Sequence, residues 1–242
     1  MAGHPAGVGD SWVKVGTITP DKGLPGGPPP DGLPERLYFH DAMHGWFVGQ
    51  TTDFAWLHAT SNGGGTWRNV RLPVPPTGHH AQVTTEIPMF FNATRGVLPV
   101  VFRKPQASGV TRQILDLYVA SDGGATWTPT APVSVQPPRD FGGTVEWDVL
   151  DARHAWVLDG DVLHVTSDGG AQWTTLHPNV VLTGMSSFDF ATARVGWMAT
   201  DVAGSEYGTL WRTMNGGRTW VPWPARMVCL TPVEPPIGPY AC

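Results

Sequence analysis

Charged residues, cysteine and long apolar runs are all scarce in this sequence of 242 residues. Lys and Arg total 15 against 20 Asp and Glu, so the formal net charge is −5 and no basic surface for nucleic acid is expected. No apolar run approaches the ~18–20 residues that span a membrane. The first residues also lack the basic and apolar regions of a signal peptide. We therefore expect no nucleic-acid partner, no membrane span and no signal peptide within this sequence.

Cysteine occurs only as Cys229 and Cys242, both in a Pro-rich tail. A disulfide between them would pin that tail and imply an oxidising compartment. Two free thiols are the alternative, and two cysteines do not decide between them.

Gly (30), Pro (24) and Trp (12) are abundant. Short strands joined by Gly/Pro turns, with aromatic side chains filling the core, are typical of all-β domains. The spacing of the prolines would break most amphipathic helices, so we expect none of normal length.

One phrase occurs four times and organises the chain. It contains Asn or Asp, then Gly-Gly, then Trp five residues after the Asn or Asp. The copies carry Asn62 and Trp67, Asp122 and Trp127, Asp168 and Trp173, Asn215 and Trp220. Asn/Asp with Gly-Gly between two extended segments predicts a tight hairpin, because glycine adopts positive φ without steric cost. Repeats 46–60 residues apart indicate a propeller or solenoid. We interpret these Asn, Asp and Trp residues as structural.

A second phrase precedes each copy and predicts a strand, an Asp/Asn turn and another strand, as in Phe39–Trp46. Each unit then reads as a four-stranded antiparallel meander, the size of a propeller blade. The predicted fold is an all-β propeller with one domain over 1–242 and about five blades. Four blades are expected at 36–70, 86–128, 145–176 and 185–223, and a composite blade from 227–242 with 11–18. The alternative is that the chain is a fragment of a longer propeller or a module of a larger assembly.

The Gly-Gly phrase resembles the Asp-box, or BNR repeat, over roughly residues 10–223. Together with the upstream strand, it is similar to the Asp-box propellers of sialidases, xyloglucan-active glycosidases, sortilin-type receptors and photosystem II assembly factors. The resemblance implies that the hairpins lie away from the ligand. It leaves function open, since that superfamily mixes hydrolases, receptors and assembly factors.

Ligand-binding residues are therefore expected on the opposite side, which we call the loop face. It would carry the second-to-third-strand loops, such as 103–113 and 200–208, and the inter-blade segments, such as 71–87 and 128–145. Loops of this kind commonly carry function. The candidate ligand-binding residues are Arg103, Arg139, Tyr207, His79 and His80. The expected ligand is a protein or a carbohydrate.

Four carboxyl groups are candidate catalysts: Glu146, Asp148, Asp189 and Glu206. Glu146 and Asp148 alternate with apolar residues on a predicted innermost strand, and Asp148 is level with Asp189 in the next repeat. A buried carboxyl has a raised pKa, which suits a general acid, and glycoside hydrolysis uses a carboxylate pair. The structural alternative, which we favour, is an inter-blade Asp that accepts from a backbone N–H or an indole.

A sialidase would carry a Phe-Arg-Ile-Pro phrase near its start. The nearest match, Phe102-Arg103-Lys104-Pro105, follows the first Gly-Gly phrase and differs at its third residue. Glu206 and Tyr207 are adjacent, so on a strand they would face opposite ways. A complete sialidase set is not assigned.

Histidine offers one apparent metal pattern, His40 and His44 on either side of Asp41. The repeat places Arg95, His154 and Val195 level with His44, so we interpret this as a rim position. No Cys/His cluster or Gly-rich phosphate loop is present. We predict no metal and no cofactor.

The sequence thus predicts a non-catalytic, extracytoplasmic or secreted binding propeller. The alternative is a glycoside hydrolase of sialidase-like or xyloglucanase-like type. Oligomeric state is left open.

Overall fold

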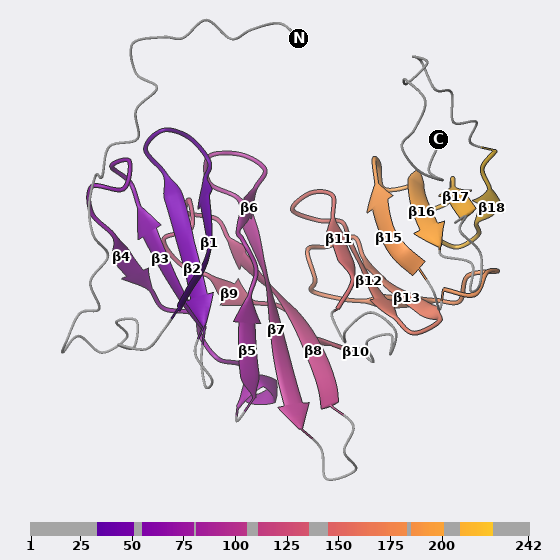
Figure 1. Cartoon of the computed structure of the whole chain (residues 1–242), viewed down its shortest axis with the longest axis horizontal. Helices are drawn as coiled ribbons and strands as arrows, with labels where there is room; N and C mark the ends of the chain where they lie inside the picture. The colour runs from indigo at the N-terminus through magenta and orange to yellow at the C-terminus, as the bar shows by residue number, and fades with distance from the viewer. Residues whose placement is uncertain are drawn as a thin grey trace, which may run out of the picture. The chain divides into compact units, whose positions relative to one another are not determined.

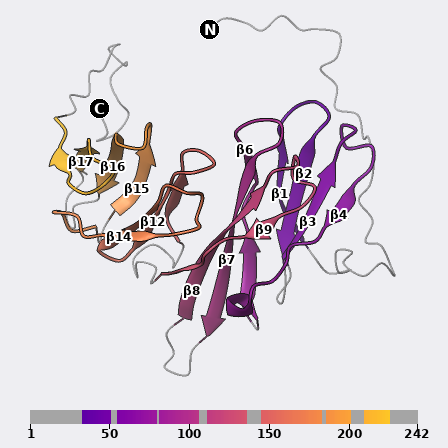
Figure 2. The same ribbon diagram turned by 180° about the vertical axis from the view of Figure 1, so that it is seen from behind.

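The computed structural model describes residues 33–50, 55–79, 81–105, 111–135, 145–182, 185–200 and 209–224 (Figures 1 and 2). Within these ranges every element is a β-strand except one 3₁₀ turn, η1 (Pro76–Gly78). The strands form separate antiparallel sheets that follow chain order. The all-β fold built from four-stranded antiparallel blades is thereby confirmed. No helix among the described residues is long and apolar enough to cross a membrane.

Three of the sheets are simple four-stranded meanders. The first contains β1 (Leu33–Phe39), β2 (Gly45–Gln50), β3 (Ala55–Thr60) and β4 (Arg68–Val70). The third contains β11 (Trp147–Val149), β12 (Ala155–Asp159), β13 (Val162–Thr166) and β14 (Thr174–Leu176). The fourth contains β15 (Met185–Phe190), β16 (Gly196–Thr200), β17 (Thr209–Thr213) and β18 (Val221–Pro222).

The second sheet is a meander whose two outer strands are each interrupted. Its strands are β5 (Gln82–Thr85), β6 (Met89–Phe90), β7 (Gly96–Pro105), β8 (Thr111–Ala120), β9 (Thr128–Pro129) and β10 (Val133–Val135). Both β5 and β6 pair with β7, and both β9 and β10 pair with β8. Pro88 and Pro132 lie in the two interruptions, where a residue without an N–H cannot continue the ladder.

This sheet corrects the loop predicted at 103–113. The strand β7 continues to Pro105 and β8 begins at Thr111, and the two are paired along their full ten residues. The inter-blade segments 71–87 and 128–145 likewise contain β5, β9 and β10. The paired strands of this sheet reach from Gln82 to Val135, beyond the predicted range 86–128.

In every sheet the first-to-second-strand turn is bonded to the Gly-Gly hairpin. The Asp41 carboxylate accepts from the backbone N–H of Met43 and His44, at 2.7 and 2.8 Å, which closes the first turn. Gly63 N then donates to Met43 O at 2.9 Å. Equivalent bonds of 2.9 Å join Gly123 to Thr94, Gly169 to Arg153 and Gly216 to Arg194. Both turns of each sheet therefore lie at the same edge, which we call the hairpin face.

Each hairpin is closed by its Asn or Asp side chain. The side-chain Oδ1 accepts from the backbone N–H four residues later, at 2.9–3.0 Å: Asn62 from Thr66, Asp122 from Thr126, Asp168 from Gln172 and Asn215 from Thr219. Asn and Asp serve equally well because both present an acceptor oxygen.

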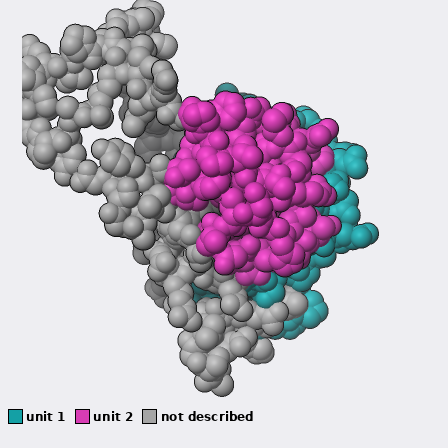
Figure 3. Space-filling model, turned by 90° about the vertical axis from the view of Figure 1, so that its right-hand side faces the viewer, with its two compact units in different colours: residues 1–136, 151–153, 166–173 teal, residues 137–150, 154–165, 174–242 magenta. Residues whose placement is uncertain are grey.

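The described chain divides into two compact units (Figure 3). Unit 1 comprises residues 1–136, 151–153 and 166–173, and unit 2 comprises 137–150, 154–165 and 174–242. One closed ring over 1–242 stays a prediction. Its composite blade, at 11–18 and 227–242, lies outside the described residues, as do Cys229 and Cys242.

One aromatic arrangement recurs in the cores of both units. In unit 1, Trp46 stacks on Phe90 with centroids 4.3 Å apart, and Trp127 meets the edge of Phe90 at 5.9 Å. In unit 2, the rings of Trp156 and Phe190 are 3.8 Å apart and nearly parallel, and Trp220 meets Phe190 at 5.9 Å. Each Trp–Phe stack joins two successive sheets.

Candidate functional site

Several predicted site residues lie outside the described part of the chain. They are the ligand-binding candidates Arg139, Tyr207 and His80 and the catalytic candidate Glu206. Their roles stay predictions.

Asp148 is half-buried on β11 and accepts a hydrogen bond from Phe190 N at 2.8 Å. Burial raises the pKa of this carboxyl, and the nearby Asp189 carboxylate raises that pKa further. Asp189 itself is exposed on β15. The two residues hold equivalent positions, opposite Trp156 and Trp197 in their sheets. Unit 2 therefore contains a carboxyl pair of unequal environment, one member of which bridges two successive sheets.

The other described candidates lie toward the loop face. Arg103, half-buried near the end of β7, donates from Nη1 to Thr84 Oγ1 at 2.8 Å. His79 is exposed after η1. Glu146 is half-buried just before β11, and its carbonyl accepts from Leu158 N at 2.9 Å. Arg103 and His79 belong to unit 1, and Glu146, Asp148 and Asp189 belong to unit 2.

The second sheet extends the loop face of unit 1. Its central strands have ten residues, against six in β2 and β3. In both ribbon views the ends of β7 and β8 project past β1–β4 (Figures 1 and 2). The extension is packed: Phe102 is 1% exposed, and a Cβ on Gly78 would come within 2.6 Å of its ring. Residues 106–110, which connect the two strands in the sequence, lie outside the described residues.

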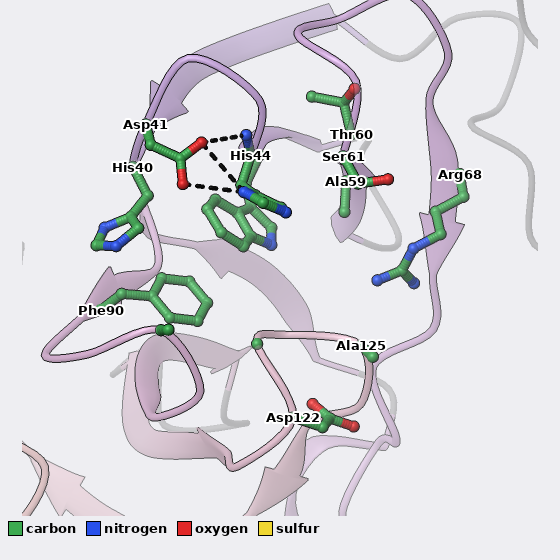
Figure 4. Close-up of a pocket in the computed structure, with 13 residues that line it drawn as sticks. His40, Asp41, His44, Ala59, Thr60, Ser61, Arg68, Phe90, Asp122 and Ala125 are labelled. Carbon is green, nitrogen blue, oxygen red and sulfur yellow. Dashed lines mark hydrogen bonds and ion pairs between the residues drawn. The ribbon is translucent and has the colours of Figure 1, made fainter.

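A cavity of about 390 Å³ lies on the hairpin face of unit 1 (Figure 4). Polar side chains from both of its sheets surround an aromatic wall. The lining residues are His40, Asp41, His44, Trp46, Ala59, Thr60, Ser61, Arg68, Phe90, Ala93, Asp122, Gly123 and Ala125.

Both carboxyl groups of the cavity are held in the ionised form. The His44 ring, whose Nδ1 lies 2.9 and 3.1 Å from the Asp41 oxygens, lowers the pKa of Asp41 to about 2. The Thr126 hydroxyl, at 2.6 Å, and its backbone N–H lower the pKa of Asp122. These bonds also fix both carboxylates in place.

Outside the cavity, the second sheet buries a carboxyl group that was not predicted from the sequence. Asp116 on β8 is 0% exposed and accepts from Thr130 N at 3.0 Å, across the interruption between β9 and β10. Burial raises the pKa of Asp116 to about 7. The available signal was a lone carboxyl within the apolar run 114–119. Its hydrogen bond with Thr130 N shows that Asp116 satisfies a backbone donor where the outer strand is interrupted.

Two indoles enclose an arginine on the fourth sheet. The Arg212 guanidinium lies 5.6 Å from the Trp197 ring centroid and 4.6 Å from that of Trp223. Trp197 is the repeat counterpart of Trp46 and Trp156, which both stack on a Phe of the following sheet. We therefore assign this stack to packing rather than to a ligand.

No group of three His, Cys, Asp or Glu side chains within the described ranges is placed to hold a metal ion.

The chain shows similarity to known proteins at the level of solved structures. No family model matches the sequence, and no curated protein matches it. One solved structure that it resembles is a xylan β-1,4-xylosidase from Bacillus halodurans C-125, with a TM-score of 0.38 and 14% identity. The match covers 81% of this chain and 42% of the xylosidase, so this chain spans less than half of that protein. A likeness this distant bears on neither activity nor ligand.

Proposed function

We propose that this chain is a non-catalytic, extracytoplasmic binding propeller of the Asp-box type, with a protein or carbohydrate ligand on its loop face. The hydrogen bonds of the four hairpins support the Asp-box assignment, since the same Asn/Asp oxygen closes each one. They also give the hairpin residues Asn62, Asp122, Asp168 and Asn215 a structural role that Asn and Asp fill equally well.

The observation that carries the proposal is the extended hairpin of β7 and β8. A repeat needs only five or six residues per central strand to make a blade, as the first, third and fourth sheets demonstrate. The added length in the second sheet projects from the loop face and is braced by β5 and β10. Arg103 lies at this projection with its guanidinium oriented by Thr84. A rigid support for a loop lowers the entropy lost on binding.

The test is a screen of the full chain against a glycan array and an array of extracellular proteins. Exchange of residues 106–110 for Asn-Gly, a two-residue hairpin turn, and Arg103→Ala should each weaken capture of the ligand at least tenfold. Arg95→Ala, an exposed arginine at the opposite end of the same sheet, is the matched control and should leave binding unchanged. Equal binding by all variants would show that the loop face does not bind the ligand.

A glycoside hydrolase is the second candidate, and the Asp148–Asp189 pair is the observation that favours it. The raised pKa of Asp148 beside an ionisable neighbour suits a general acid. Against this role, Asp148 is engaged by Phe190 N at 2.8 Å. Release of reducing sugar from xyloglucan, xylan or sialosides, abolished by Asp148→Asn, would establish the hydrolase in place of the binding protein.

A further inference from the structure

We propose that the hairpin-face cavity of unit 1 is a second binding site and that it takes a neutral sugar residue. The cavity lies entirely within residues 40–125, at the turns of the first and second sheets. It is distinct from the loop face, so neither proposal depends on the other.

Two polar residues of the cavity, His40 and Arg68, are not among those that the hairpin repeat requires. Arg68 follows the first hairpin Trp, where the other repeats have Thr128, Thr174 and Val221. His40 is matched in the other repeats by Phe91, Leu150 and Ala191. Since those repeats fold with other residue types at both positions, the fold does not require His40 or Arg68, and both can serve a ligand.

The cavity combines hydrogen-bond donors and acceptors. Asp122 offers carboxylate oxygens, each of which already accepts one hydrogen bond from Thr126 and retains a second lone pair. Arg68 offers guanidinium donors, and no hydrogen bond or ion pair engages its side chain within the described chain. Figure 4 shows Arg68 and Asp122 on one side of the cavity, with His40 and Phe90 on the other. Sugar hydroxyls act as donor and acceptor at once, so they match such a mixed set.

The cavity lining carries charged groups of both signs. Asp41 and Asp122 are ionised, and both would repel an anion. Arg68 carries a permanent positive charge and would repel a cation. A neutral polyhydroxylated ligand gains hydrogen bonds to charged groups of both signs and meets neither repulsion.

The inner wall is aromatic. Phe90 is half-buried and lines the cavity, and it stacks on the buried Trp46 with ring centroids 4.3 Å apart. The accessible part of Phe90 offers apolar surface to the C–H groups of a sugar ring. A volume of about 390 Å³ falls in the range of small-molecule sites, which begins at ~300 Å³.

Calorimetric titration of the full chain with methyl glycosides of glucose, galactose and xylose tests the proposal. We expect saturable binding of at least one with a Kd of about 1 mM, the affinity that ordinary ligand efficiency gives a molecule of this size. Glucuronate, which the Asp41 and Asp122 carboxylates would repel, should bind at least tenfold more weakly than the best neutral glycoside.

Asp122→Asn is the decisive variant, because Asn62 and Asn215 already close equivalent hairpins and the fold should persist. It should weaken binding about tenfold, since a charged acceptor is replaced by a neutral one. Asp168→Asn makes the same change in a hairpin outside the cavity and should alter Kd less than twofold.

Arg68→Gln should likewise weaken binding about tenfold, with Arg71→Gln, an exposed neighbour that does not line the cavity, as its control. The proposal is overturned if no neutral glycoside binds at 20 mM, if glucuronate binds more tightly, or if Asp168→Asn weakens binding as much as Asp122→Asn. Loss of loop-face binding in the Arg103 variants would leave these results unaffected.

Discussion

Asp116 is a buried carboxyl group whose pKa is raised well above its ordinary value. Its carboxyl is fully buried on β8 and accepts a hydrogen bond from Thr130 N at 3.0 Å. Removing a carboxylate from water disfavours the ionised form, which is why the pKa of Asp116 rises to about 7. The neighbouring Tyr118, which donates to Pro73 O at 2.5 Å, has its pKa raised by the same burial and by Asp116.

This shift predicts a specific dependence of stability on pH. Below pH ~4 the carboxyl is protonated in both states, and between pH ~4 and ~7 the unfolded chain loses that proton while the native protein keeps it. The contribution of Asp116 to the free energy of unfolding therefore falls as pH rises through that window, by about 4 kcal/mol at most. Asp116→Asn should remove this contribution and be more stable than wild type at pH 8. Urea titrations at pH 4.5 and 8 measure it, and equal pH dependence in the two proteins would contradict it.

Phe190 carries a second residue-scale prediction. It is 2% exposed between the Trp156 ring, 3.8 Å away, and the Trp220 ring. Phe190→Ala should cost about 3–5 kcal/mol, because it leaves a cavity between two indoles. Phe91→Ala, at a position 36% exposed, is the control and should cost under ~1 kcal/mol. Thermal unfolding distinguishes them, and similar losses would show that the stack is not a principal contact.

At the scale of elements, the bond between the two turns of a sheet depends on glycine. Gly169 has φ +77°, and a Cβ there would lie 2.8 Å from Ala152 O. Gly160, in the turn between β12 and β13, also has positive φ, but nothing lies within 4 Å of its Cβ position.

Gly169→Ala and Gly160→Ala therefore separate backbone strain from close approach. Both should incur the cost of a left-handed alanine, about 1–2 kcal/mol. Gly169→Ala should cost at least ~1 kcal/mol more, because the turn carrying Ala152 must move away. Chemical denaturation of both variants gives the difference, and equal losses would mean that the two turns are not closely joined.

The repeat phrases carry enough information to predict the meanders and the hairpins, because turn chemistry is local. Asn62 and Gly63 act within a few residues of their own positions, so their pattern is visible in the sequence. The long hairpin of β7 and β8 was not predicted, since its strands are held by β5 and β10, whose pairing depends on residues far along the chain. The hairpin-face cavity was not predicted for the same reason. Arg68 and Asp122 are 54 positions apart in the sequence and come to line one cavity only in the folded unit.

At the scale of the whole molecule, the net negative charge predicts that nucleic acid is not a partner. A net charge of −5 offers no counterion release on DNA. Fluorescence anisotropy with a labelled duplex at 150 mM salt should show no saturable binding. Binding that weakens steeply with added salt would contradict the expected absence of a nucleic-acid partner.

The central claim is that the chain holds its ligand without altering it. Mass spectrometry of a glycan recovered from the complex after 24 h at 25 °C tests this most directly, with wild type and Asp148→Asn compared in parallel. We expect intact glycan with both proteins and equal amounts bound. Cleaved glycan with wild type and intact glycan with Asp148→Asn would contradict it.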